Sequence, residues 1–157
     1  MLIQEVKIKS IDPIRVIGKR TIIENYKSMG PLYDKLYGTL VAQNVAPASA
    51  CMGIFYDEEY KEKDVDAEAV VPIGDATVTA DDGINVYELP AVPQMATYLR
   101  KGPYDDFTPA YQTLMEWISQ NGYQFVGPNR EIYLQSPEGG SSEEGLVELQ
   151  FPVMKRE

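Results

Sequence analysis

The residue whose chemistry stands out in this sequence is Glu131, which is followed by Ile132, Tyr133 and Leu134. Such alternation of polar and apolar residues is typical of a β-strand, in which successive side chains point to opposite faces. We therefore expect Ile132 and Leu134 to pack against a helix, and Glu131 and Tyr133 to point together into a cleft. A carboxyl group on an apolar wall is costly to ionise, so we expect its pKa to be raised until a partner arrives.

A lipophilic cation is a suitable partner for such a carboxylate. It would offset the cost of the buried charge, and each aromatic face would add about 0.5–2 kcal/mol through cation–π attraction. The sequence has 11 tyrosines and 4 phenylalanines to supply such faces. Glu148 shares a face of the last expected strand with Gln150 and is a candidate second carboxylate. By position in the expected elements, the ligand-binding candidates are Glu131, Tyr133, Phe55, Tyr104, Phe107, Glu148, Tyr26 and Met29.

These assignments have structural alternatives. Glu131 can instead pair with Arg130, its neighbour in the chain, or with another surface cation. The helix tyrosines Tyr33 and Tyr111 fit a hydrophobic core better than a ligand wall.

The composition excludes several kinds of chemistry. There is no histidine and a single cysteine, Cys51, in an apolar stretch where we expect a buried, inert thiol. Without histidine, Ser-His-Asp and Cys-His catalysis and the common zinc and haem ligands are missing. Asp64, Asp66 and Glu68 resemble a calcium loop but lack its glycine, so we expect a solvated turn there. We predict no metal and no cofactor, and any reaction would use carboxylates, tyrosines or lysines.

The charge balance argues against nucleic acid as a direct partner. The sequence has 14 basic and 24 acidic residues, a formal net charge of −10, whereas nucleic-acid binding depends on clustered cationic side chains. The same charge either attracts cationic ligands or simply aids solubility. There is no apolar run of membrane-spanning length, and the N-terminus is too charged for a signal peptide, so we expect a cytoplasmic protein.

The sequence contains an internal repeat. A shift of 78 positions aligns identical residue types in order: Tyr26 with Tyr104, Pro31 with Pro109, Tyr33 with Tyr111, Leu36 with Leu114, and Ile54 with Ile132. A shift of 80 positions places 68–73 on 148–153. We therefore predict one domain over 1–157, with repeats at about 1–80 and 81–157. Gly53 occupies the position of Glu131 in the first repeat, so only one repeat carries this carboxylate.

Each repeat is expected to form a strand, a helix and two further strands. The first helix begins at Pro31 and the second after Thr108 as N-cap, and Asn121 with Gly122 ends the second. Their expected apolar faces consist of Tyr33, Leu36, Tyr37, Leu40 and Val41, and of Tyr111, Leu114, Met115 and Ile118. Strands are predicted at 14–23, 50–57, 66–73, 129–134 and 145–153, with edge strands near 2–9 and 84–89.

Three motifs give a resemblance to a known family: residues 101–104 (Lys-Gly-Pro-Tyr), residues 127–134, which include Arg-Glu-Ile-Tyr-Leu, and residues 148–153 (Glu-Leu-Gln-Phe-Pro-Val). Together they resemble the GyrI-like small-molecule-binding domain, the effector-binding half of several multidrug-sensing transcription regulators. The resemblance implies an α+β fold of tandem duplicated β-α-β-β modules with pseudo-twofold symmetry. It further implies an antiparallel sheet with helices on one face and a central ligand cleft on the other. In related sensors a buried glutamate faces aromatic cations, and Glu131 matches it.

Three functions are compatible with these observations. The first is a stand-alone protein that captures bulky, aromatic, cationic small molecules, because the first expected strand begins too early for a preceding helix-turn-helix. The second is a hydrolase that opens strained electrophilic rings of toxic natural products, with Glu131 as general base. The third is a gyrase-interacting protein, in which the acidic surface imitates DNA.

Overall fold

The computed structural model describes residues 5–58, 60–80, 83–102, 106–135 and 145–157, and the chain folds into two compact units. We call Asp12–Ala91 the central unit, and Met1–Ile11 with Val92–Glu157 the terminal unit. Each unit combines an antiparallel sheet with an α-helix, so the chain belongs to the α+β class.

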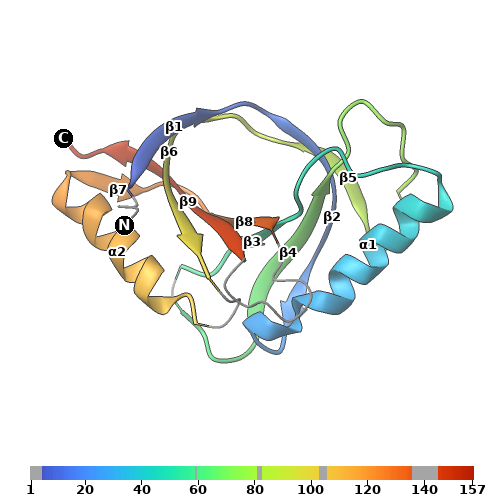
Figure 1. The fold of residues 1–157 in the computed structure, drawn as a ribbon, viewed down its shortest axis with the longest axis horizontal. Coiled ribbons are helices and arrows are strands. Elements are labelled where there is room, and N and C mark those ends of the chain that lie inside the picture. Colours follow the sequence, from blue (N-terminus) through green and yellow to red (C-terminus); the bar gives the residue numbers. More distant parts are fainter. Residues whose placement is uncertain (1–4, 59, 81–82, 103–105, 136–144) are drawn as a thin grey trace. The chain divides into compact units, whose positions relative to one another are not determined.

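The central unit has four strands, paired antiparallel in the order β3-β4-β2-β5. Its helix packs against β2 and β4 (Figure 1). The core lies between the helix and the sheet, where Leu36 and Leu40 meet Ala67, Ala69 and Val71. In chain order the elements are β2 (Ile14–Ile23), the 3-10 helix η1 (Tyr26–Met29), α1 (Gly30–Ala42), β3 (Met52–Phe55), β4 (Val65–Pro72) and β5 (Asn85–Leu89).

The terminal unit pairs its strands antiparallel in the order β1-β6-β9-β8, with β7 on β9. Its helix packs against β6 and β7 (Figure 1). Leu114 and Ile118 pack with Ala96, Val147 and Leu149 in its core. In chain order the elements are β1 (Lys7–Ile11), β6 (Val92–Lys101), α2 (Thr108–Gln120), β7 (Tyr123–Phe125), β8 (Asn129–Gln135) and β9 (Leu146–Lys155).

The predicted strands are present as β2, β3, β4, β8 and β9, with small shifts at their ends. The expected edge strands are β1, which begins later than expected, and β5. Two strands were not predicted, since β7 has only three residues and Pro93 interrupts the alternation at the start of β6. The compact units divide the chain at other points than the predicted repeats, because β1 pairs with β6 and β5 pairs with β2. The repeats themselves stay a prediction.

The buried stripes of both helices differ from the predicted ones. Residues four apart face each sheet: Leu32, Leu36 and Leu40 in α1, and Ala110, Leu114 and Ile118 in α2. Val41 and Met115 are 74% and 44% exposed, so their assignment to the apolar faces was wrong. One residue turns the helix by about 100°, and each of these side chains therefore points away from the buried neighbour that precedes it.

Two further local predictions need correction. Thr108 is the first residue of α2 rather than its N-cap, and the side chain of Asp106 accepts the Thr108 N–H at 3.0 Å. The cysteine thiol, expected to be buried, is half-buried beside Tyr37. The end of α2 is as predicted, because Gly122 adopts a positive φ of 78° directly after Asn121.

Within the described residues, neither helix is long and apolar enough to cross a membrane.

Candidate functional site

Glu131 lies in β8 of the terminal unit, on the sheet face that carries α2. Its side chain is 8% exposed. The register pairs Glu131 with Leu149 and Tyr133 with Val147, and both apolar partners belong to the core beneath α2. Paired residues of an antiparallel sheet place their side chains on the same face. Glu131 and Tyr133 therefore share a face, as expected from the alternation, and α2 covers that face.

Two tyrosines donate hydrogen bonds to the carboxylate of Glu131, one to each oxygen. Tyr111 in α2 donates to Oε2 at 2.5 Å, and Tyr133 in β8 donates to Oε1 at 2.7 Å. The side-chain amide of Asn129 donates to the Tyr111 oxygen at 3.0 Å. Because that oxygen accepts the amide proton, the phenolic proton of Tyr111 is directed toward Glu131. We call Asn129, Tyr111, Glu131 and Tyr133 the Glu131 cluster.

The environment of Glu131 acts on its pKa in two directions. Burial raises the pKa above its ordinary value of 4.5, because removal from water penalises the ionised form. The hydrogen bonds from Tyr111 and Tyr133 and the positive charge of Arg100 lower it, but burial is the larger effect. The protein thus holds a carboxyl group whose ionised form would gain from a further positive charge.

The expected orientation of β8 relative to the helix was wrong. Glu131 and Tyr133, not Ile132 and Leu134, face α2, since Tyr111 of α2 reaches the carboxylate. Leu134 is 46% exposed. The alternation fixes which residues share a face, but the helix can lie on either face. The same alternation directs Arg130, which pairs with Gln150, to the face opposite Glu131.

The other predicted site residues of the terminal unit lie in different places. Phe107 packs in the same core as Tyr111 and Tyr133, and the guanidinium of Arg100 stacks on its ring at 4.4 Å. Glu148 lies on the opposite face of the sheet, where Lys9 at 3.0 Å and the amide of Gln150 at 2.7 Å bind it. Tyr104 lies outside the described residues.

Sequence reasoning missed Tyr111, Asn129 and Arg100. The apolar helical stripe predicts Tyr111 as a core residue, and the ring does pack against the core while its hydroxyl reaches Glu131. Asn129 lies two residues before Glu131 on the same strand face, so the alternation alone could have found it. Arg100 had no local signal, since its strand, β6, was not predicted.

The first-half candidates Tyr26, Phe55 and Met29 come together in the central unit. The rings of Tyr26 and Phe55 meet edge to face at 5.5 Å, and Tyr60 stacks on Tyr26 at 5.4 Å. Met29 and Phe55 are buried in the same core. Tyr26, Phe55 and Met29 thus belong to one apolar cluster within this unit.

The central unit contains a second buried carboxylate, Glu68 in β4, which is 3% exposed. Tyr56 and Tyr87 both donate to its Oε1, at 2.5 and 2.7 Å. Burial is the main cause that raises the pKa of both tyrosines, and their bonds to Glu68 add to it. Gly18 leaves room for the other oxygen, since a Cβ there would lie 2.5 Å from Oε2. The expectation of a solvated turn at 64–68 was therefore wrong at Glu68.

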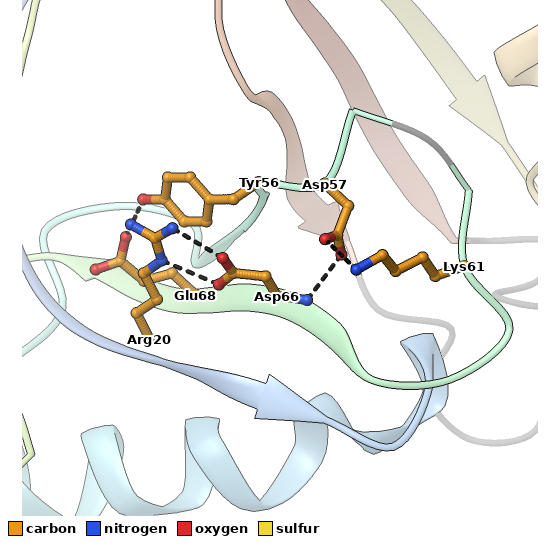
Figure 2. Close-up of polar contacts among 6 residues, drawn as sticks. All are labelled: Arg20, Tyr56, Asp57, Lys61, Asp66 and Glu68. Atoms are coloured by element: carbon orange, nitrogen blue, oxygen red, sulfur yellow. Dashed lines mark hydrogen bonds and ion pairs between the residues drawn. The ribbon is translucent and has the colours of Figure 1, made fainter.

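Arg20 extends the polar network around Glu68 (Figure 2). Its guanidinium lies 3.6 Å from the centre of the Tyr56 ring and binds both carboxylate oxygens of Asp66, at 2.8 and 3.0 Å. Asp57 accepts the Asp66 N–H at 2.8 Å and pairs with Lys61 at 3.0 Å. We call Glu68, Tyr56, Tyr87 and Arg20 the Glu68 cluster; here a protein cation already covers the aromatic ring.

Two other features bear on the choice of site. A hollow of about 530 Å³ is lined by residues of α2 and by the two residues before β1, and none of them belongs to the Glu131 cluster: Glu5, Val6, Thr113, Glu116, Trp117 and Gln120. Among the described residues, no three acidic or cysteine side chains gather as metal ligands. The Glu131 cluster is the candidate that we favour for ligand chemistry, because it holds a buried carboxyl group among aromatic side chains.

Solved structures of three proteins are similar to this chain. The C-terminal domain of EcmrR has 29% identity and a TM-score of 0.85, with 99% of this chain and 100% of that domain covered. EcmrR in a complex with DNA has 31% identity and a TM-score of 0.83. The match includes 98% of this chain but only 58% of the EcmrR chain, so this chain spans little more than half of EcmrR.

Two further structures share the fold at lower identity. A hydrolase from Listeria innocua has 12% identity and a TM-score of 0.69, with 96% of this chain and 92% of that chain covered. SAV2435 bound to tetraphenylphosphonium has 15% identity and a TM-score of 0.59, with 96% of this chain and 94% of the SAV2435 chain covered. No curated protein matches the sequence. The model of the GyrI-like small molecule binding domain matches residues 4–154, and the chain therefore belongs to this family.

Proposed function

We propose that this protein reversibly binds bulky, aromatic, cationic small molecules, with Glu131 as the counter-charge. The observation that carries the proposal is the carboxyl group of Glu131, buried among aromatic side chains with its pKa raised by burial. An ionised carboxylate in such surroundings is stabilised by any cation that reaches it. A lipophilic cation has the further advantage that it loses little hydration on entering.

The side chains around Glu131 favour an aromatic ligand. Tyr111 and Tyr133 contact the carboxylate, and Phe107 and Phe151 pack in the same core. The Tyr111 and Phe151 rings meet edge to face at 5.8 Å. All four aromatic side chains are only partly buried. Aromatic rings prefer cations over their faces and other rings at their edges, so a ligand with several aromatic rings around a charge suits this surface.

Membership of a small-molecule-binding family supports the proposal, and tetraphenylphosphonium bound to SAV2435 supports it at the level of the fold. The two tyrosine hydroxyls that donate to Glu131 favour its ionised form, which is the form that a cation needs as counter-charge.

The test compares a cation with a neutral ligand of similar shape, by calorimetric titration of tetraphenylphosphonium and of triphenylphosphine oxide. Glu131→Gln should weaken tetraphenylphosphonium binding about ten-fold or more and change triphenylphosphine oxide binding less than two-fold. The glutamine side chain keeps one oxygen that accepts a hydrogen bond from one of the two tyrosines. The hydroxyl group of the other tyrosine can rotate and accept a hydrogen bond from the glutamine NH₂ group.

Glu68→Gln is the matched control, because it alters a second buried glutamate with two tyrosine partners. Both tyrosines donate to one oxygen of Glu68, so a single amide oxygen can accept both bonds. This variant should bind tetraphenylphosphonium like the unaltered protein. Equal weakening of the cation and the neutral ligand by Glu131→Gln would contradict the proposed counter-charge.

A further inference from the structure

We propose that Phe125 is the outer aromatic contact of the ligand site, and that a cation with several rings reaches Glu131 from the side of strand β7. This role rests on the function proposed above and makes Phe125 the residue that selects for aromatic bulk. Phe125 is the last residue of β7, and its side chain is 47% exposed. Because single exposed apolar side chains are common on protein surfaces, the contacts of this ring decide its role.

A continuous series of aromatic contacts joins Phe125 to Glu131. The ring centroids of Phe125 and Phe151 lie 5.0 Å apart, with their planes tilted by 47°. Phe151 in turn meets Tyr111 edge to face at 5.8 Å, and the Tyr111 hydroxyl donates to Oε2 of Glu131. An exposed ring is thereby connected to a buried carboxyl group through two half-buried aromatic side chains.

The strand register places Phe125 and Glu131 on the same face of the terminal unit's sheet. The β9 side chains in the core beneath α2 are, in order along the strand, Val147, Leu149, Phe151 and Val153. The first pairs with Arg100, the second with Glu131 and the last with Phe125. Glu131 therefore lies between Arg100 on one side and the two phenylalanines on the other.

The charge of Arg100 sets the direction from which a cation approaches. Arg100 acts on the Glu131 carboxyl, and its guanidinium lies over the Phe107 ring at 4.4 Å. A second cation on that side would meet like charge and an occupied ring face. Among the described residues, no cation lies over the rings of Phe151 and Phe125. A cationic ligand is therefore better accommodated on the side of Glu131 away from Arg100.

The geometry of the two phenylalanines favours ligands whose rings lie in different planes. A single flat ring cannot stack on two rings that are tilted by 47°. In tetraphenylphosphonium the phenyl rings surround a central charge in different planes, so one ring can pack on Phe125 while another contacts Phe151. Because the charge of the ligand lies near Glu131, the contact with Phe125 depends on the ring and not on the charge.

The experiment titrates tetraphenylphosphonium and triphenylphosphine oxide into the full chain carrying Phe125→Ala. Both ligands should bind about three- to ten-fold more weakly than to the unaltered protein, because each loses one ring contact. The effect should be similar for the two ligands, unlike the charge-selective effect of Glu131→Gln. Unchanged binding of both ligands would overturn the role of Phe125. Weakening of tetraphenylphosphonium alone would also contradict it, since Phe125 would then act on the charge.

Met154→Ala is the matched control, because Met154 is 48% exposed and lies in the neighbouring strand β9. Met154 pairs with Gln124, so its side chain points to the face opposite Phe125. This variant should change the binding of either ligand less than about two-fold. Equal losses in Met154→Ala and Phe125→Ala would show a general effect on the β7–β9 pair and overturn the proposed contact.

Phe125→Tyr separates the ring contact from a general effect of substitution at this position. The tyrosine keeps the aromatic face, and its hydroxyl reaches water because the position is exposed. Tetraphenylphosphonium should therefore bind within about two-fold of its affinity for the unaltered protein. A loss as large as that in Phe125→Ala would contradict the ring contact.

Proton NMR of the complex measures the contact directly. Nuclear Overhauser effects should connect the phenyl protons of tetraphenylphosphonium with the ring protons of Phe125 and Phe151. Effects that reach the Met154 methyl group but not the Phe125 ring would overturn the proposed direction of approach.

The two proposals fail in distinguishable ways. If Phe125→Ala changes neither ligand while Glu131→Gln selectively weakens tetraphenylphosphonium, the role of Phe125 alone is wrong. If Phe125→Ala weakens both ligands but Glu131→Gln affects them equally, the counter-charge is wrong and the aromatic contact stands. If the unaltered protein binds neither ligand, both proposals are wrong.

Discussion

The hydroxyl group of Tyr111 donates to Oε2 of Glu131 at 2.5 Å and so links helix α2 to strand β8 within the terminal unit. Asn129 fixes the direction of this bond, because its amide donates to the same hydroxyl oxygen at 3.0 Å. The helix is thereby attached to the sheet through the carboxyl group that we propose as the ligand's counter-charge. A ligand that changes the state of Glu131 would also affect the attachment of α2.

The first prediction concerns this bond. At a pH at which Glu131 is ionised, Tyr111→Phe should lower the free energy of unfolding by about 1.5–3 kcal/mol, the usual range for a hydrogen bond to a charged group. It should also raise the Glu131 pKa further, since the Tyr111 bond lowers it. Urea denaturation and carbon-13 NMR titration measure the two effects.

Tyr33→Phe is its matched control, because the Tyr33 hydroxyl in α1 donates to the neutral backbone oxygen of Met52 at 2.6 Å. It should cost only about 0.5–1.5 kcal/mol and leave the Glu131 pKa unchanged. Equal effects of the two substitutions on that pKa would contradict the role of the Tyr111 bond.

The second prediction is the pH dependence of stability. The folded protein keeps a proton on Glu131 at pH values where the unfolded chain, with a pKa near 4.5, has lost it. The resulting stabilisation is complete below pH of about 4.5 and is lost as the pH rises through the higher pKa of the folded state. The free energy of unfolding of the unaltered protein, relative to Glu131→Gln, should therefore fall with rising pH. Urea denaturation of both proteins between pH 4 and 8 tests this. If the free energy of unfolding of the unaltered protein, relative to Glu131→Gln, instead rises with pH, the Glu131 pKa is lowered in the folded state and the prediction is wrong.

The third prediction concerns Gly18. Gly18→Ala would place a Cβ 2.5 Å from Oε2 of Glu68, whose carboxylate is held by Tyr56 and Tyr87. We expect a loss of about 1–3 kcal/mol in the free energy of unfolding, as for other overpacked buried sites. Denaturant unfolding measures the loss.

The matched control for Gly18 is Gly38 in α1, where an added Cβ would meet nothing within 4 Å. Gly38→Ala should stabilise the protein by about 0.4–1 kcal/mol, because alanine restricts the unfolded chain and favours the helix. Destabilisation by both substitutions would indicate that the contact with Glu68 is not the cause.

The fourth prediction separates two neighbouring residues of α1. Leu40 is 1% exposed and Val41 is 74% exposed. Leu40→Ala should cost about 2–5 kcal/mol, whereas Val41→Gln should change the free energy of unfolding by less than about 0.5 kcal/mol. Thermal or denaturant unfolding distinguishes the two, and a large loss for Val41→Gln would place its side chain in the core after all.

Much of the local structure followed from the sequence. The β-branched run at 14–23 predicted β2, and the spacing around Pro31 and Pro109 predicted both helices. The same local rule grouped Glu131 with Tyr133, because alternation along a strand is a property of the backbone alone. Motifs in the second half also indicated the GyrI-like family.

The rest depended on contacts between residues far apart in the chain. Only the tertiary structure placed α2 on the Glu131 face, since a strand pattern does not specify which face a helix will cover. Strand register likewise brought Arg100 into the row beside Glu131 and buried Glu68 against Gly18. The order of residues along the chain was enough to predict which side chains lie together along each element. The tertiary structure determined which elements meet, because those contacts depend on packing across the sheet rather than on local backbone geometry.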